Sequence, residues 1–340
     1  MATRRQVALA VLGAVGFFLG VQLGALSLLA PFDAAGYQAV ENPQDPTNSL
    51  FYIVVLLVAT AGMLLLFRYE RTNVLRVGIV LTSGLISAYV FSVFLPPLTG
   101  GLDLPIHGGA FLGALVVVVG LLYYPEWYVI DGAGLIMGMG AAALFGISLD
   151  VLPVLLLLVV LAVYDAVSVY GTEHMLTLAS GVMELRVPVI VIIPTSASYS
   201  FIRMADRMAS EVDESQDGEL AESAEADHPP EPEGSMAATE ASDGPPEQSG
   251  DDGGESSEEG PFDRDAFFIG LGDAVIPTIL VASATAFLET PTVLGIEMAS
   301  LGAIIGTLAG LLGLLWMVLK GRAHAGLPLL NGGSILGYLL

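Results

Sequence analysis

Two aspartates, Asp165 and Asp273, are the residues of this sequence best placed to do chemistry. Each lies in an apolar run long enough to cross a membrane, residues 151–172 and residues 266–288. A charge in mid-membrane costs roughly 2.5–3.5 kcal/mol even on insertion-based scales, so such a group usually faces a partner or a wet cavity. Two carboxyls held together in a low dielectric cannot both ionise. They share a proton, so that one acts as a base for water and the other as an acid.

The positions of the two aspartates along their apolar runs predict that the carboxyls meet. Asp165 lies six residues before Gly171, and Asp273 lies eight residues after Asp265. At the rise of an α-helix these spacings correspond to depths of about 9 Å and about 12 Å from the same membrane face. Two other acidic residues, Asp131 and Glu297, lie near segment ends, where a polar head can reach the surface, and we expect them to be structural.

Composition places the chain among multi-span membrane proteins. Of its 340 residues, 54% are hydrophobic and 14% are charged, and the apolar residues occur in blocks of about 20. Cysteine is absent, which excludes disulfides, thiolate metal sites and a cysteine nucleophile. The four histidines are scattered without the spacing of metal ligands, so we expect no metal and no cofactor.

Nine apolar segments indicate an all-α polytopic membrane protein. They are residues 7–31, 50–67, 77–95, 109–124, 128–147, 151–172, 266–288, 293–319 and 327–340. With the N-terminus in the cytoplasm, all 11 Lys and Arg residues fall on the cytoplasmic side, as the positive-inside rule requires. The last segment is short for a membrane about 30 Å thick. The predicted location is the cell membrane.

The connection between the sixth and seventh segments has three parts. Residues 173–185 have helical apolar spacing and predict an amphipathic helix in the membrane surface. Residues 187–194 are β-branched residues between prolines, which favours a strand. Residues 206–265 carry 21 acidic and two basic side chains, and the polar composition of residues 206–260 predicts a disordered cytoplasmic loop. Such an acidic segment suits a high-salt cytoplasm and suggests a halophilic archaeal source. The predicted division is residues 1–205, 206–262 and 263–340.

Three short motifs on the sixth, seventh and ninth segments resemble those of one family. Tyr164-Asp165 is similar to the Tyr-Asp motif of presenilins and signal peptide peptidases, which are intramembrane aspartyl proteases. The same family has a Gly-x-Gly-Asp motif, matched by Gly270-Leu271-Gly272-Asp273, and a Pro-Ala-Leu motif, resembled by Pro328-Leu329-Leu330. The sequence departs from the pattern at Leu329, where the family has alanine, and this raises the question of substrate fit.

The resemblance implies hydrolysis of a peptide bond within a membrane-spanning substrate helix. It implies catalytic roles for Asp165 and Asp273, and a fold of two bundles, segments 1–6 and 7–9, with the active site between them. Gly270 and Gly272 remove side chains beside Asp273, which lets a backbone or substrate approach. The expected partners are membrane-protein or signal-peptide substrates and the lipid bilayer; no nucleic acid is expected, and obligate partner subunits are not implied.

Other interpretations stay open at this point. A proton- or cation-coupled transporter also uses paired intramembrane carboxylates, but it predicts inverted repeats that this sequence lacks. A prepilin-type peptidase shares Gly-x-Gly-Asp only, and a non-catalytic scaffold is the remaining alternative. Tyr164 either packs or bonds the aspartates through its hydroxyl. For a protease, we expect residues 187–193 to offer a strand edge to an unwound substrate, because unwound backbone in lipid needs hydrogen-bond partners.

Overall fold

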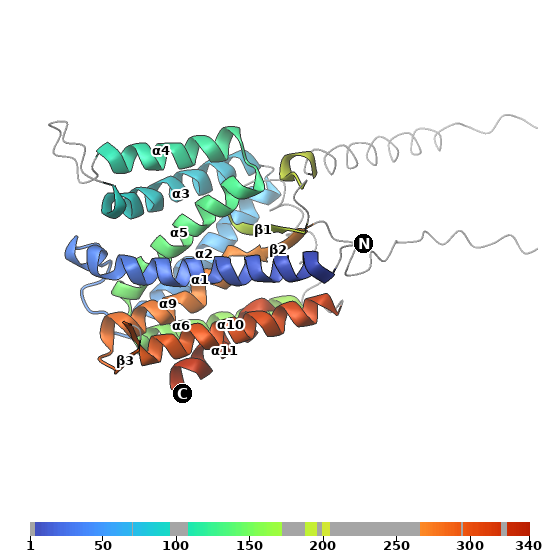
Figure 1. Cartoon of the computed structure of the whole chain (residues 1–340). Helices are drawn as coiled ribbons and strands as arrows, with labels where there is room; N and C mark the ends of the chain where they lie inside the picture. Colours follow the sequence, from blue (N-terminus) through green and yellow to red (C-terminus); the bar gives the residue numbers. More distant parts are fainter. Residues whose placement is uncertain are drawn as a thin grey trace, which may run out of the picture.

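A computed structural model describes residues 4–69, 71–95, 108–171, 188–195, 199–204, 266–293, 295–320 and 325–340. Nine long helices account for most of these ranges (Figure 1). They are α1 (Arg4–Ala34), α2 (Thr47–Arg68), α3 (Thr72–Phe94), α4 (Gly108–Tyr123), α5 (Trp127–Ser148), α6 (Val151–Gly171), α9 (Leu271–Phe287), α10 (Met298–Leu319) and α11 (Gly326–Leu339). The predicted amphipathic helix at 173–185, the acidic segment and all four histidines lie outside the described residues.

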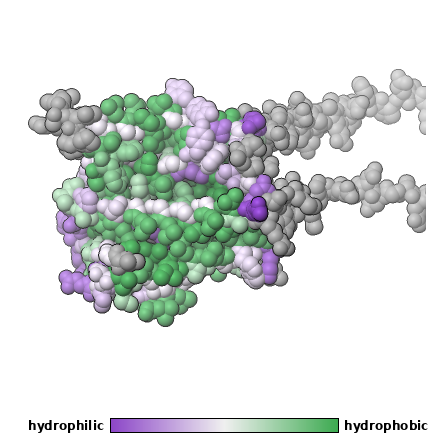
Figure 2. Space-filling model, viewed as in Figure 1, coloured by the Kyte–Doolittle hydropathy of each residue, from purple (hydrophilic) through white to green (hydrophobic). Residues whose placement is uncertain are grey.

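The helices confirm a mostly helical membrane protein. Six of them, α1, α2, α3, α5, α6 and α10, are long and apolar enough to cross a membrane by length and composition. The helices α4 and α9 are apolar but shorter, with 16 and 17 residues, and α11 has 14. Figure 2 shows hydrophobic side chains over most of the visible flank, with hydrophilic residues gathered toward its ends. Each predicted segment contains a helix, and the count of nine membrane spans stays a prediction.

The prediction for residues 266–288 was wrong in its first five residues. Ala266–Gly270 form a strand, β2, and the helix α9 begins only at Leu271. A short apolar run cannot be assigned to helix or strand by periodicity alone, and here pairing with a distant strand decides. Asp273 is therefore the third residue of a helix rather than the eighth. Because a strand rises about twice as far per residue as a helix, the depth calculated from helical rise does not apply to Asp273.

The partner of β2 is the strand predicted within residues 187–194. Strand β1 (Ile190–Pro194) pairs with β2 antiparallel, with Ile190 opposite Gly270 and Pro194 opposite Ala266. This confirms the expectation of a strand in that stretch. The sheet lies at the end of the bundle where α1 begins (Figure 1). A second, two-residue pairing joins β3 (Thr292–Val293) to β4 (Ile296–Glu297) through Gly295, whose φ of 80° favours glycine.

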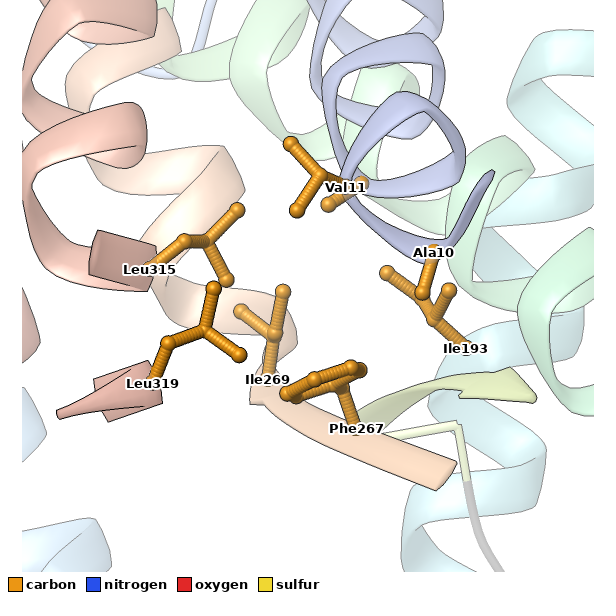
Figure 3. A pocket seen from close by; sticks show the side chains of 8 residues that line it. Ala10, Val11, Ile193, Phe267, Ile269, Leu315 and Leu319 are labelled. Carbon is orange, nitrogen blue, oxygen red and sulfur yellow. The ribbon is translucent and has the colours of Figure 1, made fainter. Parts of the chain in front are cut away.

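Both faces of the β1–β2 sheet are covered by helices. One face packs in a hydrophobic cluster with α1 and α10, and the other in a cluster with α3, α4 and α5. Figure 3 shows a small apolar hollow on the first face, between α1, α10 and the sheet. It is lined by Ala10, Val11, Ala14, Ile193, Phe267, Ile269, Leu315 and Leu319. The two strands are thus part of the protein core.

Helix α5 is central to the packing of the bundle. It contacts α1, α3, α4, α9 and β1. Small residues make this possible: a Cβ added at Gly140 would lie 2.6 Å from the side chain of Val90 on α3. The largest hydrophobic cluster combines buried residues of α1, α3, α5, α6 and α9, so the predicted N-terminal and C-terminal bundles share one core.

Helices α10 and α11 pack backbone against backbone. Gly302, Gly306 and Gly310 recur every four residues on α10 and face α11, where Gly333 and Gly337 have the same spacing. A Cβ added at Gly306 would lie 2.8 Å from the carbonyl carbon of Gly333 and 3.0 Å from the Cα of Gly337. Small residues at four-residue spacing are the usual means by which membrane helices approach this closely. The position of α11 therefore depends on glycines of α10.

We predict that Gly306→Ala destabilises the protein while Gly313→Ala, on the same helix, does not. An added methyl at Gly306 meets backbone atoms that cannot rotate away, whereas one at Gly313 has nothing within 4 Å. The first change should lower the free energy of unfolding by about 1–3 kcal/mol. The second should leave it unchanged or raise it by up to about 1 kcal/mol through helix propensity. Thermal unfolding in detergent measures both, and equal melting temperatures would contradict the packing described here.

Candidate active site

Asp165 lies in the last two turns of α6, where its carboxyl meets the beginning of α11. The carboxylate Oδ2 accepts a hydrogen bond from the backbone N–H of Leu327, with a distance of 3.1 Å between the nitrogen and the oxygen. Leu327 is the second residue of α11, so its N–H is one of those that a helix leaves without an internal partner. A residue 162 positions away along the chain thus satisfies a backbone donor of this helix.

Asp273 lies in the first turn of α9 and contacts the same helix start. A Cβ added at Gly326, the first residue of α11, would lie 2.8 Å from Asp273 Oδ2 and 3.3 Å from Oδ1. The backbone of Gly326 therefore passes directly beside this carboxyl, at a position where a side chain would collide with it. Sequence reasoning did not predict a role for Gly326. The nearest signal was its place two residues before the Pro328 motif.

The first two residues of α11 bring the two predicted aspartates together. Gly326 lies against Asp273, and Leu327 donates to Asp165. The structure therefore places the aspartates of the sixth and seventh segments against consecutive residues of α11. The strand in front of α9 places Asp273 differently from the helical estimate.

Two helix N-termini point toward this pair. The N-terminus of a helix carries roughly half a positive elementary charge, which stabilises nearby anions. Asp273 is in the first turn of α9, and both carboxyls contact the first turn of α11. Backbone dipoles thus supply positive potential where the carboxylates lie.

The Gly270-Leu271-Gly272 motif joins β2 to α9, the helix that carries Asp273. The N–H of Leu271 donates to the carbonyl of Val189 at 2.8 Å, which extends the strand ladder into the first residue of α9. Leu271 is buried, whereas Gly272 is exposed, and a Cβ there would meet only Ile276 at 3.8 Å. A Cβ at Gly270 would make an ordinary contact with Asp273, at 3.7 Å. The described neighbours leave space beside Asp273 at both glycines.

The three residues of the Pro328 motif are consecutive in α11 and lie in different surroundings. Pro328 is in the first turn, where a missing N–H costs no helical bond. Leu330 is fully buried in the cluster that also contains Leu271. The Leu329 side chain packs on this cluster, and a Cβ at Gly310 of α10 would lie 3.1 Å from the Leu329 carbonyl carbon. The leucine that departs from the family pattern thus contributes to the packing between α10 and α11.

The remaining acidic and aromatic candidates lie in different surroundings. Tyr164 is 43% exposed on α6. Asp131 accepts a hydrogen bond from the N–H of Ile192 in β1 at 2.8 Å, so it anchors the sheet to α5. Glu297 accepts two hydrogen bonds from Thr290, one from its N–H at 2.9 Å and one from its hydroxyl at 2.7 Å. These contacts agree with the structural interpretation of Asp131 and Glu297.

Both carboxyls thus lie against the start of α11, at Gly326 and Leu327. Comparisons with known proteins place the chain in a family. A sequence model of the family "Signal-peptide peptidase, presenilin aspartyl protease" matches residues 15–340. The chain belongs to this family and is an aspartyl protease of the membrane. Among curated proteins, none matched the chain significantly.

Solved structures agree with this assignment. The chain is similar to a presenilin family intramembrane aspartate protease solved in the C222 space group, with 32% sequence identity, a TM-score of 0.59 and coverage of 97% of both chains. A structure described in the same words in the P2 space group gives 32% identity and a TM-score of 0.58, covering 96% of this chain and 95% of that one. The transporter interpretation finds no support in these comparisons.

We predict that Gly326→Ala lowers the rate of cleavage of a membrane-helix peptide, whereas Gly332→Ala leaves it unchanged. Alanine at Gly326 pushes α11 away from Asp273, and a displacement of this kind costs about tenfold or more in rate. At Gly332, on the same helix, an added Cβ meets nothing within 4 Å. Cleavage rates of the two purified variants are the measurement. A Gly326→Ala enzyme as fast as the Gly332→Ala enzyme would show that close approach at Gly326 is unimportant.

Proposed function

We propose that Asp165 and Asp273 form the catalytic dyad of an intramembrane aspartic endopeptidase that cuts within transmembrane helices. The observation that carries this proposal is the convergence of both carboxyls on Gly326 and Leu327 at the start of α11. The pair shares one proton: the ionised carboxyl takes a proton from the attacking water, and the protonated one donates to the oxygen of the scissile carbonyl. The helix N-termini stabilise the charge left on the pair.

The proposed orientation places the N-terminus, the β1–β2 sheet and the acidic segment on the cytoplasmic side of the cell membrane. This is supported by the distribution of the 11 basic residues in the sequence. It is also consistent with the hollow beside the sheet, where the beginning of α1 and the end of α10 meet. Substrates are membrane-protein or signal-peptide helices that enter from the lipid.

We predict that Asp165→Asn and Asp273→Asn each lower cleavage by about 10²- to 10⁴-fold, the usual contribution of acid–base catalysis. An amide cannot share the proton that the two carboxyls exchange. Asp131→Asn is the matched control, because its amide keeps an oxygen that accepts from Ile192. Hydrolysis of a membrane-helix peptide by the purified variants is the measurement, with thermal unfolding to confirm folding. Near-normal proteolysis by either folded dyad variant would exclude the assignment.

We further propose that an unwound substrate adds as a strand to β2, which moves the expected edge from residues 187–193 to residues 266–270. One edge of β1 is occupied by β2, and on its other edge the N–H of Ile192 is bonded to Asp131. Along an antiparallel ladder, hydrogen-bonded residue pairs alternate with pairs that are not hydrogen-bonded. Because Leu271 is bonded to Val189, the next hydrogen-bonded pair is Val191 with Ile269. The backbone N–H and C=O of Phe268, which lies between these pairs, therefore point away from β1. That outer edge of β2 leads directly to Asp273.

We predict that Phe268→Pro impairs cleavage much more than Phe268→Ala. Both changes remove the ring, but only proline removes the N–H that points away from β1, and proline is tolerated on a strand edge. The strand pairing with β1 uses Phe267 and Ile269 and is spared. Cleavage of a helical peptide should fall by about tenfold for each lost backbone bond worth roughly 1–1.5 kcal/mol. If both folded variants cut equally fast, strand addition at β2 is wrong.

A further inference from the structure

Asn331 is a polar residue buried completely within α11. Its side chain is 0% exposed, in a helix otherwise made mainly of apolar residues and glycine. Burying an amide is unfavourable unless it is hydrogen-bonded. The Asn331 amide nitrogen donates to the backbone carbonyl of Leu158 on α6, at 3.0 Å. This bond crosses between two helices that are joined at the site by the Leu327-to-Asp165 bond.

The two hydrogen bonds connect the same faces of α6 and α11. Leu327 and Asn331 are four residues apart, one above the other on one face of α11. Leu158 and Asp165 are seven residues apart, which is two turns along one face of α6. The two helices are therefore antiparallel and are joined by two successive hydrogen bonds. The Asp165 bond lies at the start of α11, and the Asn331 bond lies one turn further along that helix.

The Asn331 bond adds a directional constraint to less specific packing. Apolar side chains of α11 pack against the cluster that contains Leu158 of α6, and the glycines of α10 set how closely α11 approaches on its other side. Ser334 donates to the carbonyl of Pro277 on α9, at a long 3.4 Å. The Asn331 bond thus constrains the rotation and axial position of α11 against α6, and these decide where the Leu327 N–H points.

The chemistry of the contact explains why an asparagine stands here. A backbone carbonyl only accepts hydrogen bonds, so the group that faces Leu158 must be the amide NH₂. Leucine has nearly the same size but carries no donor. The amide oxygen of Asn331 is buried without a hydrogen-bond partner among the described residues. Among the described residues, the Asn331 side chain therefore bonds only through its NH₂ group.

We propose that Asn331 is a positioning residue for the proteolytic reaction: its hydrogen bond to Leu158 holds the start of α11 where the Leu327 N–H meets Asp165. The inference rests on the proposed function for its effect on rate. Its structural half, the placement of α11 against α6, is independent of that function. Asn331 does not touch the reacting atoms and acts through α11.

The test compares Asn331→Leu and Asn331→Ala, both of which lack a donor, with Gly332→Ala as the control on the neighbouring residue of α11. Loss of this hydrogen bond should lower kcat by roughly 10- to 100-fold, as expected for a misplacement near 1 Å, with KM little changed. The control should keep the parent values. The alanine variant covers the case in which the leucine variant fails to fold. Unchanged kcat in either folded variant overturns the proposal.

A second readout follows the position of α11 without any activity. Because the chain contains no cysteine, two spin labels can be placed uniquely, at the exposed residues Val159 on α6 and Leu336 on α11. The distribution of distances between the labels should shift or broaden in Asn331→Leu and stay as in the parent in Gly332→Ala. A fall in kcat with an unchanged distribution overturns positioning as the cause. If the dyad variants instead retain proteolysis, the proposed function fails, while the label distances still decide whether Asn331 places α11.

Discussion

The arrangement depends on placing two carboxyl groups against one helix start among apolar helices, where charge is unfavourable. Even the single negative charge of a pair that shares one proton is costly in a low dielectric, and the bundle offsets this cost with backbone groups. The start of α11 gives an N–H to Asp165 and a side-chain-free backbone to Asp273. Asp273 also lies in the first turn of its own helix, so the dipoles of α9 and α11 both stabilise a negative charge here. The glycines of α10 and the strand before α9 serve to bring these helix ends to one place.

The β1–β2 sheet is the element that sets the beginning of α9. Five paired residues on each strand stop the helix from extending backward through residues 266–270, and the ladder continues to Leu271. Asp131 fixes β1 to α5 through Ile192, so the sheet is tied to the centre of the bundle. A carboxylate that sequence reasoning assigned to a structural role is therefore connected to the site through two strands. Its contribution is to the position of Asp273, not to the chemistry.

The sequence predicted those parts of the site that depend on a residue and its immediate neighbours in the chain. Asp165 and Asp273 stand out because an ionisable residue in an apolar run is expensive, and the strand near residue 190 stands out because prolines bound β-branched residues. The strand at residues 266–270 was read as helix, since its apolar run continues without a break into α9. Gly326 and Asn331 were not predicted, because their roles come from contacts with residues that lie far away in the sequence. A glycine near a helix start and a lone asparagine carry no signal before those contacts are known.

The packing of α10 against α11 bears on how the last helix enters the membrane. A helix of 14 residues is about 21 Å long, short of the roughly 30 Å of a bilayer core. Inserted alone, it would leave polar ends within the hydrocarbon. Backbone-to-backbone contact along the glycines joins it to α10, which has 22 residues. We therefore expect the two helices to enter the lipid together as one hairpin rather than one after the other.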